Sequence, residues 1–246
     1  MRKRVIHTVE ILILLGIMGI GSIAKTQYAP VLPFVSGLIA MLAAIRTSGF
    51  SIRPLLKPHQ TNPERRINED RLFLGIQSVA EMTLVLLAAA LGLVANWLLI
   101  KLGLRWLLLV QSFGGFLVIF VGAFCHRGAV SQLGDRWVDG IETLKNHRIE
   151  ITSWYSLVRH PIYLGIGLVK VGTLASVGGP IAAILFGMFL FLAQWRRAAL
   201  EECLLTSENP SAYGKYQITT PTMLVPRKSA LKPFFTMVAR EFLRWY

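Results

Sequence analysis

Two polar clusters in the second half of the chain hold the residue types that could do chemistry. In the first, at 159–163, Arg-His-Pro and a tyrosine stand where a cationic loop meets an apolar stretch. Arg159 and His160 can donate hydrogen bonds, and Pro161 suits the first turn of a helix, where its missing N–H costs nothing. An anionic or zwitterionic small molecule could bind there, at a membrane surface. The alternative is a plain helix start, with an arginine reaching the headgroups and Tyr163 in an aromatic belt.

The second cluster follows the last apolar stretch and contains Arg197, Glu201 and Glu202. Arg197 and Glu201 are four residues apart and share one face of a helix, so by themselves they predict only an ordinary ion pair. Ionisable residues at the edge of a membrane are, however, more often functional than decorative. The pair therefore gains weight if it lies beside the first cluster.

A short connection predicts that the two clusters meet. Gly178-Gly179-Pro180 joins the apolar segments 161–177 and 181–195. A link of this length makes the two helices antiparallel neighbours. The far ends of the hairpin, which carry the two clusters, are therefore expected side by side.

The composition is that of a membrane protein. The 246 residues are 54% hydrophobic and 16% charged, with mean hydropathy +0.54, whereas soluble domains average about 25% charged residues. We expect an all-α polytopic membrane bundle of about five to six transmembrane helices, with a C-terminal helical hairpin and a cytoplasmic pocket. The candidate spans are 9–24, 31–45, 72–100, 104–124, 161–177 and 181–195.

The charge distribution predicts the orientation. The net charge of +13 could suggest nucleic acid, but with six spans all but four of the 26 Lys and Arg residues fall on one side; the four are Lys25, Lys101, Arg105 and Lys170. This bias places both termini and the long loops in the cytoplasm, facing anionic lipids, and no nucleic-acid partner is expected. The opening Met-Arg-Lys-Arg also resembles a secretory signal. We favour a retained first span, because no clear cleavage site follows it.

The chain divides at a proline-rich loop. We expect an N-terminal transmembrane hairpin at 1–50, a cytoplasmic loop at 51–71, a membrane core at 72–231 and an amphipathic C-terminal helix at 232–246. Cys125 and Cys203 fall at predicted helix ends, with no spacing typical of a metal site or a disulfide framework. We interpret them as unpaired thiols.

Three motifs in sequence resemble a known family. R-H-P-I-Y-L-G, an apolar hairpin, R-x-x-x-E-E-x-x-L from Arg197 and Y-x-x-Y at Tyr213 and Tyr216 look like the isoprenylcysteine carboxyl methyltransferases and the related phospholipid N-methyltransferases. The resemblance covers 122–226. It implies an integral membrane enzyme that uses S-adenosyl-L-methionine and methylates a lipid or prenylated small acceptor from the bilayer.

The resemblance also assigns site residues. Arg197 matches the arginine near the methyl acceptor, and a two-pronged hydrogen bond from it suits a carboxylate. A carboxylate acceptor is already ionised, whereas an amine acceptor would need a general base, for which Glu202 is the candidate. The residues expected on the cofactor side are His147, Arg148, Ile149, Glu150, Tyr155, Arg159, His160, Pro161, Ile162, Tyr163 and Glu201.

The sequence departs from the family pattern in two places. The usual T-S-G-x-Y is replaced by Thr152-Ser153-Trp154-Tyr155, which is one residue shorter and lacks the glycine, so the backbone path beside the cofactor is in question. Asn209-Pro210 replaces the usual F-G before Y-x-x-Y. This second change falls at a predicted surface turn.

Two other classes of function compete with methyl transfer. Membrane sterol or steroid reductases look partly similar in their C-terminal helices, but they would need a larger pocket for NADPH. A non-catalytic scaffold or a small transporter is the other possibility, and Lys170 and Glu81, within predicted spans, are the residues that favour transport. The pairing of R-x-x-x-E-E with R-H-P favours the methyl donor.

Overall fold

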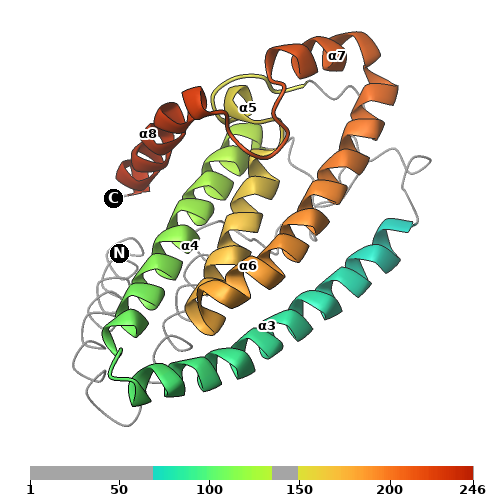
Figure 1. Ribbon diagram of the computed structural model, residues 1–246. Helices are drawn as coiled ribbons and strands as arrows, with labels where there is room; N and C mark the ends of the chain where they lie inside the picture. Colours follow the sequence, from blue (N-terminus) through green and yellow to red (C-terminus); the bar gives the residue numbers. More distant parts are fainter. Residues whose placement is uncertain (1–68, 135–148, 246) are drawn as a thin grey trace, which may run out of the picture.

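The computed structural model describes residues 69–134 and 149–245 (Figure 1). The predicted hairpin at 1–50 and nearly all of the predicted loop at 51–71 lie outside these ranges. So do two of the predicted cofactor residues, His147 and Arg148.

The described ranges fold into helices and contain no strand, which confirms the all-α prediction for this part of the chain. The helices are α3 (Glu69–Lys101), α4 (Trp106–Leu133), α5 (Trp154–Leu157), α6 (Pro161–Glu208), α7 (Pro210–Thr219) and α8 (Lys228–Trp245).

Helix α6 is a hairpin with two arms. Gly179 has φ 78° and ψ −179°, a conformation open to glycine but strained for other residues, and Pro180 follows without an N–H to continue the helix. Figure 1 shows the two arms running back alongside each other from this turn. The antiparallel pair predicted from Gly178-Gly179-Pro180 is therefore confirmed, with each of the last two predicted spans forming one arm.

Helix α4 packs closely along the first arm of α6 through glycines seven residues apart. A Cβ added to Gly122 would lie 2.7 Å from the Gly165 carbonyl oxygen, and one added to Gly172 would lie 2.8 Å from the Gly115 carbonyl oxygen. Small residues let two helix backbones approach to this distance, which is how membrane helices associate where water gives no driving force. On the other side, α3 packs against the turn of the hairpin, where Ala88 is completely buried.

Helices α4 and α6 are long and apolar enough to cross a membrane, and α3 contains a shorter apolar stretch, Leu86–Lys101. Large apolar side chains remain exposed on their outer faces, such as Phe113 at 70% and Ile181 at 71%. Lengths and surfaces together indicate an integral membrane protein. The total of five to six spans stays a prediction.

The C-terminal helix α8 begins at Lys228, four residues before the predicted start. Its apolar side packs on the protein: Phe242 meets the rings of Phe120 and Phe124 on α4, and Phe234 meets Trp154 edge to face. The rest of its surface exposes basic residues together with apolar side chains such as Phe235 at 54% and Leu243 at 71%. The amphipathic C-terminal helix therefore packs one apolar side on the protein.

The two cysteines are free thiols, as predicted. Cys125 is not at a helix end, however. It is fully buried within α4, where its thiol contacts the carbonyl oxygen of Pro161 at 3.4 Å.

Two neighbouring glycines on α4 provide a matched test of the helix contact. A Cβ on Gly115 would overlap the Ser176 hydroxyl and lie 2.8 Å from the Gly172 carbonyl oxygen, whereas a Cβ on Gly114 would meet nothing within 4 Å. We expect Gly115→Ala to cost about 1–3 kcal/mol of stability, because backbone atoms cannot move aside. Gly114→Ala should leave thermal unfolding in detergent unchanged or raise its midpoint. Equal midpoints for the two variants would contradict this packing.

Candidate functional site

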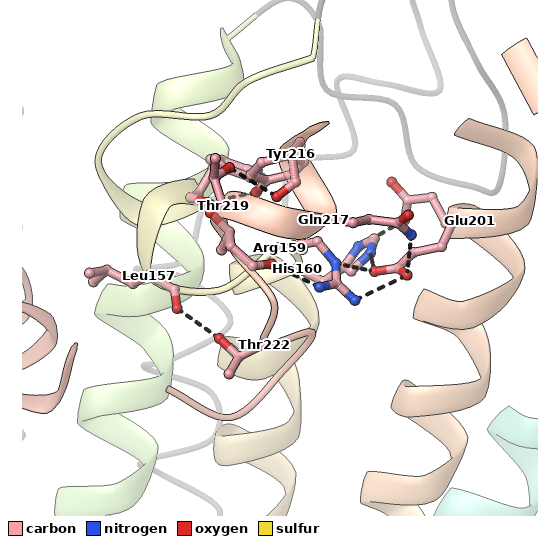
Figure 2. A network of polar contacts seen from close by, with 11 residues as sticks. Leu157, Arg159, His160, Glu201, Tyr216, Gln217, Thr219 and Thr222 are labelled. Carbon is pink, nitrogen blue, oxygen red and sulfur yellow. Dashed lines mark hydrogen bonds and ion pairs between the residues drawn. The ribbon is translucent and has the colours of Figure 1, made fainter. Parts of the chain in front are cut away.

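An ion pair closes the open end of the α6 hairpin (Figure 2). Arg159, just before the first arm, donates from Nε to Glu202 Oε1 at 2.6 Å and from Nη2 to Glu202 Oε2 at 3.2 Å. The two side chains are only 9% and 12% exposed. Two parallel hydrogen bonds between a guanidinium and a carboxylate are among the strongest polar contacts in proteins. They hold the start of the first arm against the end of the second.

His160 joins the same cluster from the residue before α6. Its Nε2 lies 3.1 Å from Glu202 Oε1, and its Nδ1 lies 3.7 Å from Glu201 Oε2. The imidazole is 5% exposed and stacks on the Tyr163 ring with centroids 5.7 Å apart. Gln217 of α7 adds a further hydrogen bond, 3.2 Å long, to Glu202 Oε2. Glu202 is thus held from three sides.

Arg197 and Glu201 lie beside Tyr163, next to this closed network, and Glu201 is less enclosed than Glu202. The Arg197 guanidinium lies 5.3 Å from the centre of the Tyr163 ring, a cation–π contact. Tyr163 also interacts electrostatically with both Arg197 and Glu201. The Glu201 side chain is 32% exposed, against 12% for Glu202. Of the two adjacent carboxylates, Glu201 is therefore the more accessible to a ligand.

The segment after α7 supports the cluster through the backbone. The N–H groups of Arg159 and His160 donate to the carbonyl oxygens of Thr222 and Met223, both at 3.0 Å. Arg159 Nη1 also donates to the Thr220 carbonyl oxygen at 2.8 Å. The turn before α6 is therefore fixed by residues about 60 positions later in the chain.

The Y-x-x-Y motif anchors this support. Tyr213 and Tyr216 are buried and meet edge to face, and the Tyr216 hydroxyl donates to the Tyr155 carbonyl oxygen at 2.6 Å. Burial raises the pKa of Tyr216 above its usual value, against a smaller opposing effect of Arg159. The hydroxyl therefore stays protonated and remains a donor at neutral pH.

The structure brings together one group of the predicted residues: Arg159, His160, Pro161, Tyr163, Arg197, Glu201 and Glu202. Tyr155 and Ile162 instead lie in or against the apolar core that α4, α5 and α8 share. Ile149 is half-buried at the edge of that core, and Glu150 is half-buried and accepts from Gln132 and Thr152. A cofactor contact by these four residues stays a prediction.

The altered T-S-W-Y stretch has an unusual backbone. Ser153 has φ 50°, in the left-handed region that glycine adopts most easily. Gln132 of α4 bridges the stretch: its amide nitrogen donates to the Thr152 carbonyl oxygen at 2.8 Å, and its oxygen accepts from the Trp154 N–H at 3.2 Å. The strained backbone of Ser153 and the bridging side chain of Gln132 thus shape the stretch that differs from the family pattern.

Sequence reasoning missed three groups of supporting residues: Gln132, Gln217 and the segment 220–223. Gln217 had a usable signal, because it directly follows the Y-x-x-Y motif. Gln132 and 220–223 had none, because their contacts are made across large separations in sequence.

Comparison with known proteins confirms the family resemblance. Residues 113–207 match the model of the isoprenylcysteine carboxyl methyltransferase (ICMT) family. A curated relative, the Schizosaccharomyces pombe protein-S-isoprenylcysteine O-methyltransferase, is 27% identical over 110 residues, which are 44% of this chain and 46% of the relative. The matched part thus spans about half the length of that relative. No solved structure matches the chain.

The two tyrosines of the motif allow a matched test of the support. The Tyr216 hydroxyl has a buried acceptor, whereas the Tyr213 hydroxyl is buried without a hydrogen-bond partner within the described ranges. We expect Tyr216→Phe to lower the free energy of unfolding by about 1 kcal/mol or more, since it leaves the Tyr155 carbonyl unpaired. Tyr213→Phe should be neutral or stabilising. Chemical denaturation of both variants measures this, and a larger loss for Tyr213→Phe would refute the assigned anchor.

Proposed function

Because the match to the ICMT family covers both polar clusters, we propose that this chain is an integral membrane methyltransferase. It uses S-adenosyl-L-methionine and acts on the carboxylate of a lipid-like, prenylated acceptor. One observation carries the proposal: the Arg159–Glu202 ion pair closes the α6 hairpin and leaves Arg197 and Glu201 beside the Tyr163 ring. The family match also favours methyl transfer over an NADPH reductase or a non-catalytic role.

The chemistry of the residues around Tyr163 suits the methyl donor. Glu201 offers a partly exposed carboxylate that can accept from an ammonium group or from ribose hydroxyls. The His160 ring and the N–H groups in the first turn of α6 can hold a carboxylate, because the N-terminus of a helix favours negative charge. The same assignment extends, from the resemblance, to His147–Glu150, Tyr155, Pro161 and Ile162. Arg159 and Glu202 we assign a positioning role, since each satisfies the other.

The acceptor side is built on Arg197. S-adenosyl-L-methionine, when bound, supplies an electrophilic methyl group on a sulfonium sulfur. The chain has to hold the acceptor oxygen in line with that methyl group and keep water out. Arg197 can bind a carboxylate with two parallel hydrogen bonds, and a carboxylate needs no general base at neutral pH.

The surroundings of Glu202 favour a carboxylate over an amine acceptor. A phospholipid N-methyltransferase would need a base, and Glu202 was the candidate for that role. Both of its oxygens already accept hydrogen bonds from Arg159, and His160 and Gln217 add two more. A carboxylate held in this way by a cation is a weak base.

The membrane setting serves both substrates. With six spans and the positive charges inside, both termini and the open end of the α6 hairpin face the cytoplasm, where the polar donor is dissolved. The acceptor then enters between the helices from the bilayer. Anionic lipids are the partners that the cationic loops and α8 would attract.

A labelled donor tests the function and the type of methyl bond together. The purified full-length chain in lipid nanodiscs is incubated with S-adenosyl-L-methionine tritiated in its methyl group and with S-prenylated N-acetylcysteine. We expect label to enter the acceptor and to be released by mild base as volatile methanol, because esters are hydrolysed and N-methyl groups are not. Label that base does not release would indicate amine methylation. An absence of incorporation would contradict the proposal.

Two substitutions should separate donor binding from transfer. Glu201→Ala removes the exposed carboxylate, so calorimetry should show donor affinity at least tenfold weaker, as expected for a lost charge-assisted hydrogen bond. Arg197→Ala should leave donor affinity within about twofold and lower kcat by about 100-fold or more, as loss of an orienting contact does.

Neighbouring residues provide the controls. Arg196→Ala removes an exposed positive charge next to Arg197, and Glu208→Ala removes a carboxylate seven residues beyond Glu201 on the same helix. Both control variants should bind the donor and turn over as the unaltered chain does. Unchanged donor affinity in Glu201→Ala, or normal turnover in Arg197→Ala, would remove that residue from its proposed role.

A further inference from the structure

Gln194 is a buried polar residue with no role in the proposed reaction. It lies on the second arm of α6 and is only 1% exposed. Neither its Oε1 nor its Nε2 has a hydrogen-bond partner within the part of the chain that the structure describes. Buried amide groups are nearly always hydrogen-bonded, because an unpaired one loses its contacts with water and gains nothing. A side chain of this kind is suited to a ligand that brings the missing partners.

Gln194 lies on the helix face that carries the acceptor residue. It precedes Arg197 by three residues and Ala198 by four, and residues at these spacings are neighbours on one helix face. Ala198 is completely buried and packs with Tyr163. This face therefore points toward the first arm of the hairpin. Gln194 lies about 4.5 Å farther along the helix from its open end than Arg197 does.

The first arm presents a glycine, and no side chain, to Gln194. Gly167 stands there, one turn after Tyr163, and a Cβ added to it would lie 3.9 Å from the Gln194 Cγ and 3.8 Å from a ring carbon of Phe191. The glycines that face α4 differ, because a Cβ at Gly122 or Gly165 would come within 3 Å of backbone atoms. Gly167 is thus not required for close helix contact. Its missing side chain leaves a gap that a methyl group would fill, one helical turn after Tyr163.

We propose that Gln194 binds an amide group of the methyl acceptor, next to the carboxylate held by Arg197. This inference rests on the proposed function. A carboxamide both donates and accepts, so it can pair with the N–H and the C=O of an amide at the same time. In an N-acylated amino acid the amide and the carboxylate are attached to the same carbon, so two side chains less than one helical turn apart can contact both groups. Gln194 would therefore make the enzyme select N-acylated, peptide-like acceptors over simple lipid carboxylic acids.

Two acceptors that differ only in the amide test this selectivity. S-farnesyl-N-acetylcysteine carries an acetamido group beside its carboxylate, and S-farnesylthiopropionic acid is the same molecule without that group. We expect the unaltered chain to use the first with a kcat/KM at least tenfold higher. In Gln194→Leu this preference should fall to about twofold or less through loss of kcat/KM for the amide acceptor alone, with donor affinity unchanged.

Two further variants keep the test independent of folding. Gly167→Ala places a methyl group in the space opposite Gln194 at ordinary contact distance, and it should also lower kcat/KM for the amide acceptor more than for the other. Gln111→Leu removes a carboxamide at the far end of the hairpin, where it donates to the Ser176 carbonyl oxygen. It should leave the preference unchanged.

The outcomes distinguish this inference from the proposed function. If the unaltered chain methylates neither acceptor, the proposed function fails and the inference fails with it. If the unaltered chain methylates both equally, only the role of Gln194 fails. Equal losses for both acceptors in Gln194→Leu would also overturn that role. Weaker donor affinity in Gln194→Leu would overturn it as well, by placing the residue on the donor side.

Discussion

The ion pair between Arg159 and Glu202 holds the two ends of the α6 hairpin in register, and the geometry of the site depends on it. Both charges are largely removed from water, so each needs the other as a partner. Two parallel hydrogen bonds, with further contacts from His160, Gln217 and the Thr220 carbonyl, offset the loss of hydration on burial of the pair. As a result, the start of one arm and the end of the other form a fixed frame, and their side chains face each other across it.

Two neighbouring glutamates have different roles at the open end of the hairpin. Glu202 is enclosed and accepts hydrogen bonds from three side chains, which suits a structural carboxylate. Glu201, one residue earlier, turns toward Tyr163 and remains about a third exposed. Because successive residues on a helix point about 100° apart, one helix end can supply both a structural and a ligand-binding carboxylate. The glycine contacts between α4 and the first arm of α6 fix the position of that arm.

The sequence predicted the parts of this arrangement that local chemistry determines. Gly178-Gly179-Pro180 is too short a link for the two apolar helices to be anything but antiparallel neighbours, so the hairpin and the meeting of its far ends followed from it. Pro161 stands in the first turn of α6, where its missing N–H costs no hydrogen bond. The family resemblance was carried by motifs on these same elements, and the comparisons confirm it over 113–207.

The remaining features depend on contacts between distant parts of the chain. Nothing local to 220–223 indicates that its carbonyl groups accept from Arg159 and His160. The left-handed backbone of Ser153 depends on its surroundings, which include the bridge from Gln132. Glu202 was predicted as a possible base, because its position in the sequence does not show that Arg159 donates hydrogen bonds to both of its oxygens. Gln194 could not be predicted as a site residue either, because the sequence does not show that this glutamine is buried.

A structure of the full chain bound to S-adenosylhomocysteine, the product left after methyl transfer, tests the central claim most directly. The account predicts that this molecule lies against His160 and Glu201, with its sulfur facing Arg197 and with the Arg159–Glu202 pair intact. A product bound elsewhere on the chain, or an α6 hairpin whose two ends have separated, would contradict it.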